Sequence, residues 1–163
     1  MSPFNAFLFL QGLETLSLRM ERHVENAMAV AKYLEAHDLA ANVTYPGLPN
    51  SRFQPLVDKY LPRGAGAVFS FDCRGGRAAG QNFIRGVTLW SHLANVGDSK
   101  SLIIHPASTT HRQLDDDELK AAGVGPGTIR LSVGTESMDD LIWDLEQGFA
   151  ATAAAASSGV AAV

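Results

Sequence analysis

The 163-residue chain has only one cysteine, Cys73, which excludes an internal disulfide. A lone thiol is typical of a reducing compartment, so the sequence favours the cytoplasm. Acidic residues outnumber basic ones by 17 to 13, and the net charge of -4 offers no basic surface to nucleic acid. No apolar run is long enough to cross a bilayer, and the N-terminus lacks the basic segment and cleavage site of a secretory signal. The composition is otherwise that of a globular domain.

Metal-binding and phosphate-binding motifs are also missing. His92, His105 and His111 lie in one region of the sequence, but no pair of histidines has the helical spacing of a zinc site. We therefore expect no metal. The glycine-rich stretch 123–127 precedes a predicted strand, whereas the glycines of a phosphate cradle open a helix. Turn formation is the better interpretation of these glycines.

The hydrophobic periodicity predicts an α+β fold. Residues 2–36 predict a long helix with a bend near Gly12 or Ser17, because their apolar positions recur every three or four residues. Short strands and helices alternate after it, and some connections between strands are too short for parallel crossovers. We expect a small antiparallel or mixed sheet covered by helices on one face. The strands are predicted at 67–71, 88–93, 101–104 and 128–133, and the helices at 55–60, 75–86, from 115 and from 137.

The two ends of the chain differ in character. Residues 4–10 are apolar on every side, which is normal only for a helix that is buried all round. We expect this segment to dock in an oligomer or against an upstream domain. Residues 151–163 are small and uncharged, and predict a loosely ordered tail after a domain that spans 1–150.

Arg130 is the strongest candidate for a binding residue. In the stretch 128–133 apolar and polar residues alternate strictly, so Arg130 shares one face of a strand with Thr128 and Ser132. A guanidinium on a rigid strand matches a carboxylate in a bidentate manner, although a surface salt bridge is the more common role. Asn95 follows a predicted strand and could bind a ligand carboxylate, or could satisfy the backbone of a turn.

The four lysines do not suggest a Schiff-base site. Such a site requires an activated lysine. Lys32 lies on the long helix, Lys59 and Lys120 are expected in solvent, and Lys100 enters a strand. None of them has the small-residue surroundings of an internal cofactor linkage.

Taken together, four stretches resemble the C-terminal domain of pyridoxal-phosphate enzymes of the Cys/Met metabolism family. They occur in the family's order and cover most of residues 2–150. The stretches are 2–8 (SPFNAFL), 12–20 (GLETLSLRM), 101–111 (SLIIHPASTTH) and 129–136 (IRLSVGTE). The resemblance implies a small domain of the fold type I, aspartate-aminotransferase-like architecture. It also implies pyridoxal phosphate as cofactor and a homotetramer or dimer for the complete enzyme.

Within this family the stretch 95–98 is similar to the O-acetylhomoserine sulfhydrylase branch. It reads Asn-Val-Gly-Asp, where cystathionine synthases and lyases often have Ser-Leu-Gly-Gly. The branch implies replacement of acetate by sulfide at the γ-carbon, which gives homocysteine in methionine biosynthesis. A fragment of a cystathionine γ-synthase or γ-lyase type enzyme remains an alternative. A non-catalytic α+β binding or oligomerisation module is another.

The resemblance assigns roles to two residues of this chain. Arg130 matches the arginine that clamps the substrate α-carboxylate, and Asn95 occupies the position of a residue that assists it. The family's catalytic lysine and its other cofactor-binding groups match nothing here, and the resemblance places them in an upstream domain. We therefore expect a carboxylate clamp that is inactive alone, with its own N-terminal domain as partner.

Overall fold

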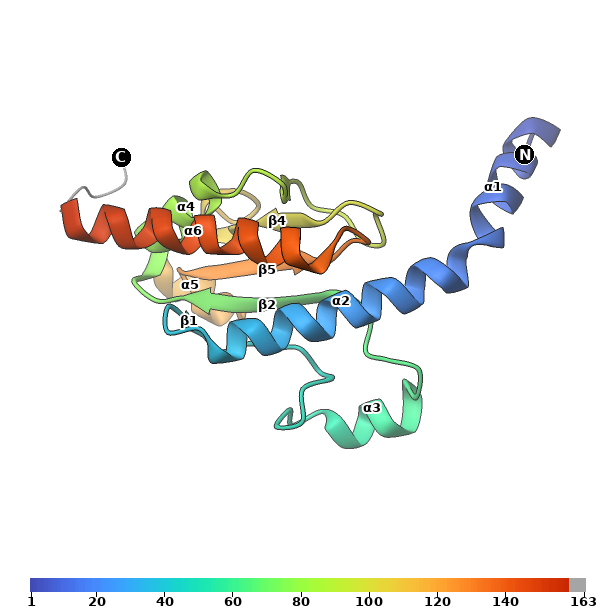
Figure 1. Ribbon diagram of the computed structural model, residues 1–163. Coiled ribbons are helices and arrows are strands. Elements are labelled where there is room, and N and C mark those ends of the chain that lie inside the picture. The colour runs from blue at the N-terminus through green and yellow to red at the C-terminus, as the bar shows by residue number, and fades with distance from the viewer. Residues whose placement is uncertain (159–163) are drawn as a thin grey trace.

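The computed structural model describes residues 1–158. Two helices open the chain, and short strands interspersed with helices follow them (Figure 1). The helices are α1 (Pro3–Glu14), α2 (Leu16–Ala36), α3 (Gln54–Tyr60), α4 (Gly76–Gly86), the 3-10 turn η1 (Pro106–Ser108), α5 (Asp116–Ala121) and α6 (Met138–Ser158). The strands are β1 (Ala40–Ala41), β2 (Val68–Cys73), β3 (Ser91–His92), β4 (Leu102–Ile104) and β5 (Thr128–Ser132).

The five strands form one mixed sheet in the order β1-β2-β5-β4-β3. Strand β5 is central and pairs antiparallel with β2 on one side and with β4 on the other. The pair β1–β2 is also antiparallel, whereas β3 and β4 run parallel. The mixed sheet expected from the short connections is therefore confirmed.

One face of the sheet carries the core. Because side chains alternate along a strand, Phe71 on β2 and Ile129 and Leu131 on β5 point to the same side, and all three are fully buried. Helices α2, α4 and α6 cover this face (Figure 1) and add their apolar residues to the same cluster. These residues are Ala27, Val30, Ala31 and Leu34 on α2, Ala79 and Phe83 on α4, and Leu141, Leu145 and Phe149 on α6.

The long N-terminal helix is divided in two at Thr15, whose φ of -106° and ψ of 9° interrupt the helix. Helix α1 extends away from the sheet beyond the end of α2 (Figure 1), and none of its residues is buried. Phe4, Phe9 and Leu10 are each more than 60% exposed. The helix predicted to be buried on every side therefore presents its apolar side chains to solvent in this chain.

The strand expected over 88–93 is only partly correct, since β3 is limited to Ser91–His92. The backbone N–H groups of Thr88, Leu89 and Trp90 donate to the carboxylate of Asp144 instead of to a neighbouring strand. The Asp144 side chain, distant in sequence, thus binds the N–H groups that a longer strand would use to pair with its neighbour. Edge strand β1 was not predicted, because two alanines give no periodic pattern.

The expectation of a loosely ordered tail from residue 151 is wrong for residues 151–158, because α6 continues to Ser158. Thr152 is buried, and its hydroxyl donates to the Gly148 carbonyl within α6 and lies 3.3 Å from the Ala79 carbonyl of α4. Small residues allow α6 and α4 to approach closely at this point. Residues 159–163 lie outside the described part of the chain.

Candidate functional site

Arg130 lies at the middle of the central strand on the face opposite the core. Its register partners are Ser70 on β2 and Ile104 on β4. The alternation predicted for 128–133 is observed over residues 128–131, since Ile129 and Leu131 are fully buried while Thr128 and Arg130 remain partly exposed, but Ser132 is buried as well. The guanidinium is therefore carried by a rigid element and reaches solvent.

The structure places Asn95 beside Arg130. One guanidinium nitrogen of Arg130, Nη2, donates to the backbone carbonyl of Asn95 at 3.3 Å. The Asn95 side chain serves its own turn, because its Oδ1 accepts from the Val96 N–H at 2.9 Å. The two predicted site residues are brought together, through the backbone of Asn95 and not through its amide.

The Arg130 guanidinium has donors left for a ligand. Among residues 1–158 no carboxylate lies within 4.0 Å of it, whereas Arg22 and Arg77 each have an acidic partner. A guanidinium offers five N–H donors in a planar fork that fits a carboxylate. The surface salt bridge that we considered for Arg130 is thus not formed within the described chain. The arrangement is suited to holding a small carboxylate ligand.

Asp144 binds the start of the segment that leads to Asn95. It was not among the site residues that the sequence indicated. Its side chain is 0% exposed and accepts from the backbone N–H groups of Thr88, Leu89 and Trp90 and from the Thr88 hydroxyl. One signal was available, because Asp144 sits directly beside Leu145 on the apolar face of α6. A carboxylate at a core position is normally fully hydrogen-bonded.

His105 is buried and hydrogen-bonded within the fold, and does not face the Arg130–Asn95 site. It is 0% exposed, and its two ring nitrogens lie 2.9 Å from the Ser108 Oγ and 2.8 Å from the Pro126 carbonyl. The Pro126 carbonyl can only accept, so Nε2 carries the proton and Nδ1 accepts from Ser108. Burial lowers the pKa of His105, and the nearby Arg77 and His92 add to this, while the bond to Pro126 opposes it.

No metal site is found within residues 1–158, because no three His, Cys, Asp or Glu side chains there could hold an ion together. The histidines therefore form no shared metal site in the described part of the chain. None of the helices formed by these residues is both long enough and apolar enough to span a membrane.

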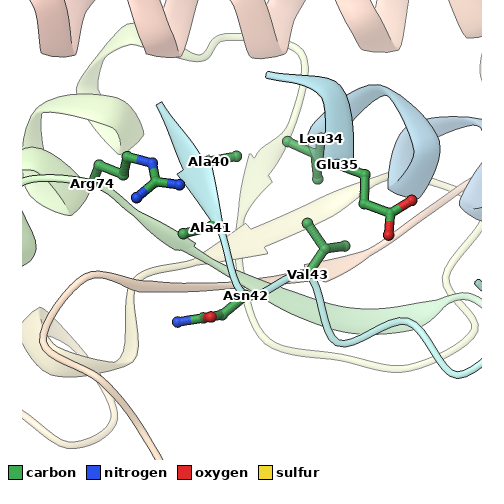
Figure 2. A pocket seen from close by; sticks show the side chains of 7 residues that line it. All are labelled: Leu34, Glu35, Ala40, Ala41, Asn42, Val43 and Arg74. Carbon is green, nitrogen blue, oxygen red and sulfur yellow. The ribbon is translucent and has the colours of Figure 1, made fainter. Parts of the chain in front are cut away.

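A surface hollow of about 410 Å³ lies at edge strand β1, and none of its lining residues belongs to the Arg130–Asn95 site. Figure 2 shows Ala40 and Ala41 in its wall, with Arg74 and Glu35 on different sides. Arg74 is held by the Asp38 carbonyl, to which its Nε donates at 3.0 Å. The hollow therefore holds no cluster of reactive groups.

A family model for the Cys/Met metabolism PLP-dependent enzymes matches residues 1–150. The chain belongs to this family. Two similar curated proteins are a homocysteine synthase of Schizosaccharomyces pombe, 53% identical, and an O-acetyl-L-homoserine sulfhydrylase of Leptospira meyeri, 52% identical, and each match covers 90% of this chain. The chain spans only 34% and 33% of their lengths. The resemblance inferred from four sequence stretches is thereby confirmed.

Solved structures of the family have the same fold. A Campylobacter jejuni protein assigned as an O-acetylhomoserine (thiol)-lyase superposes with a TM-score of 0.82 at 45% identity, over 92% of this chain and 36% of that one. Its lysine carries a pyridoxyl phosphate group. The cystathionine gamma synthase of Xanthomonas oryzae, in complex with cystathionine, gives a TM-score of 0.81 at 40% identity, over 94% and 39% of the two chains. The predicted α+β fold is confirmed.

The residues of this chain do not by themselves fit pyridoxal phosphate. All four lysines, Lys32, Lys59, Lys100 and Lys120, lie in the described part of the chain and are exposed. The lysine of an enzyme Schiff base is normally activated by desolvation or by a cationic neighbour. The family uses the cofactor, but we find no place within residues 1–158 where this chain alone would anchor it.

Proposed function

We propose that this chain is the C-terminal domain of an O-acetylhomoserine sulfhydrylase and supplies its clamp for the substrate α-carboxylate. The reaction replaces the acetate of O-acetylhomoserine by sulfide and gives homocysteine. The single observation that carries the proposal is Arg130, a guanidinium on the central strand that has no acidic partner within residues 1–158 and lies beside Asn95. The names of relatives about half identical to the chain support the same activity.

The division of work follows from which groups are present. Arg130 binds and orients the amino-acid substrate by its carboxylate, and the Asn95 segment fixes the position of the guanidinium. Pyridoxal phosphate provides the electron sink of the family's chemistry, and we propose that another domain of the same polypeptide holds it. This chain spans only about a third of the length of these relatives, which supports the proposal that another domain holds the cofactor.

Helix α1 is the proposed contact with that second domain. Phe4, Phe7, Phe9 and Leu10 form an apolar surface in which each side chain is more than half exposed. Contiguous apolar surface of this kind normally lies in an interface. We propose that the domain which holds the cofactor covers it, and that the complete enzyme is a homo-oligomer of the cytoplasm. The buried free thiol of Cys73 fits a reducing compartment.

A cystathionine γ-synthase is the second candidate, because the Xanthomonas oryzae enzyme matches almost as well in fold. The two activities differ in the sulfur nucleophile, which is sulfide for the sulfhydrylase and cysteine for the synthase. The test supplies the complete enzyme with O-acetylhomoserine and either sulfide or cysteine at equal concentration. Faster release of acetate with sulfide supports the sulfhydrylase. Faster release with cysteine would identify the synthase, and release with neither would refute the proposed sulfhydrylase.

A further inference from the structure

The segment that carries Asn95 is fixed at both ends by carboxylates that come from distant parts of the chain. At its entry, Asp144 on α6 accepts from the backbone N–H groups of residues 88–90, with N–O distances from 2.8 to 3.0 Å. At its exit, Glu136 accepts from the Ser101 N–H at 2.6 Å and from the Ser101 hydroxyl at 2.8 Å. Both contacts join residues more than thirty positions apart.

Between these ends, β3 pairs with β4, and the Ser99 carbonyl accepts from the backbone N–H of Thr135 at 2.9 Å and from its hydroxyl at 3.2 Å. Residues 93–97 are all exposed. Among the hydrogen bonds that the structure describes for residues 93–98, only the bond from Arg130 to the Asn95 carbonyl joins residues more than two positions apart. The position of Asn95 against Arg130 therefore depends on how residues 88–92 and 99–101 on either side of it are held.

The entry contact is the stronger of the two. Asp144 is 0% exposed, and its two oxygens accept from three backbone N–H groups and one hydroxyl. Hydrogen bonds to an ionised acceptor are shorter and stronger than neutral ones. Trp90 adds a second link to α6, since its indole N–H donates to the Leu141 carbonyl at 3.2 Å. Helix α6 thus sets the starting point of the segment.

We propose that Asp144, with Glu136 at the other end, is a positioning residue for the substrate carboxylate clamp. It touches neither Arg130 nor a ligand, and acts by holding the segment whose carbonyl orients the guanidinium. This inference rests on the proposed function, because it assigns Asp144 to the same site. It predicts that a change in α6, on the core face of the sheet, is felt on the opposite face as weaker binding of the amino-acid substrate.

The main variant is Asp144→Asn, which keeps the shape of the side chain but turns one oxygen into a donor that faces other donors. Thr88→Val is a milder variant that removes only the hydroxyl bond, and Glu136→Gln tests the exit. The matched control is Asp140→Asn, an exposed carboxylate on the same helix. Thr88→Val guards against the case in which Asp144→Asn fails to fold, because the exposed Thr88 retains its backbone bond to Asp144.

In the complete holoenzyme we expect Asp144→Asn to raise the KM for O-acetylhomoserine roughly tenfold, with the KM for sulfide and kcat nearly unchanged. Thr88→Val should raise the same KM less, and Asp140→Asn should not change it. Adding Asp144→Asn to Arg130→Lys should raise the KM no further, because both act through one clamp. A merely destabilising change would multiply the two effects, and that result would overturn the proposal.

A measurement on the chain itself separates this proposal from the proposed function. In NMR spectra of the 163-residue chain, Asp144→Asn should shift the side-chain Nε–H of Arg130 and the backbone N–H of Asn95, while Asp140→Asn should not. Unchanged signals for both residues would overturn the positioning role. If these signals shift but Arg130→Lys leaves the KM of the holoenzyme unchanged, the carboxylate clamp is refuted and the positioning of Arg130 stands.

Discussion

The Arg130 guanidinium donates to the carbonyl oxygen of Asn95 across 3.3 Å, although the two residues are 35 positions apart. The contact joins the central strand to an exposed segment at the edge of the sheet. It brings together the two residues that the sequence indicated for substrate binding. The carbonyl of Asn95, and not its side-chain amide, meets the arginine.

The capping box of α5 gives a prediction about stability. The Asp115 side chain accepts from the N–H groups of Asp117 and Glu118, and the Glu118 side chain accepts in return from the Asp115 N–H. Replacing such a cap by alanine costs about 1 kcal/mol. Urea unfolding of Asp115→Ala should show this loss, whereas Gln113→Ala, an exposed change outside the helix, should leave the unfolding curve in place. Equal curves for both variants would show that the cap contributes nothing.

Gly80 is required by the contact between α4 and His105. A Cβ at position 80 would lie 2.6 Å from the His105 ring, well inside van der Waals contact. Gly80→Ala should therefore destabilise the chain by about 1–3 kcal/mol, the usual cost of overpacking. Gly12→Ala is the matched control on α1, where a Cβ would have no neighbour within 4 Å. It should be neutral or stabilising by up to about 1 kcal/mol. A Gly80→Ala chain as stable as the original would contradict this packing.

His105 gives the fold a dependence on pH. Burial lowers its pKa below the ordinary value of 6.5, so the folded chain binds this proton less tightly than the unfolded chain does. The stability that the neutral ring provides is complete above pH 6.5 and is lost as the pH falls through 6.5 toward the lower folded pKa.

The measurement is the free energy of unfolding at about pH 7.5 and about pH 5.5. We expect a decrease at the lower pH in the original chain and a smaller decrease in His105→Gln, whose amide can still donate toward the Pro126 carbonyl. A decrease of the same size in both chains would show that His105 is not the group responsible.

The four exposed lysines predict how the chain behaves with its family's cofactor. When pyridoxal phosphate is added to the chain in equimolar amount, its absorbance should remain that of the free aldehyde, because no lysine forms a specific Schiff base with it. Borohydride reduction followed by peptide mapping should find no single lysine labelled in proportion to protein. One lysine labelled stoichiometrically would mean that this chain holds a cofactor site of its own. Lys120, which lies 3.5 Å from Asp117, and Lys32 serve as internal references for random labelling.

The features that the sequence predicted correctly are those determined by neighbouring residues. The alternation around Arg130 predicted a strand with one buried face, and the local sequence predicted a helix from 115, which begins there with a capping box. Both are local patterns, and both are observed. The family resemblance then depended on short stretches that retain these patterns in order.

The features that the sequence missed depend on contacts between distant residues. Strand β3 is short because Asp144, more than fifty positions away, binds the donors of residues 88–90. Helix α6 extends to Ser158 because Thr152 packs on α4, which composition alone could not indicate. The contact from Arg130 to the Asn95 carbonyl likewise could not be predicted from the sequence. Every residue has a backbone carbonyl, so only the fold shows which one the arginine reaches.

The most direct test of the account measures the KM for O-acetylhomoserine in the complete enzyme with Arg130→Lys. Lysine keeps the charge but loses the planar fork, and each hydrogen bond to a charged group is worth about 1.5–3 kcal/mol. The control is Arg112→Lys, at an exposed position. We predict a KM raised at least tenfold, roughly 1.4 kcal/mol, for Arg130→Lys, with the KM for sulfide unchanged. A KM for O-acetylhomoserine equal to that of the unmodified enzyme would contradict the carboxylate clamp.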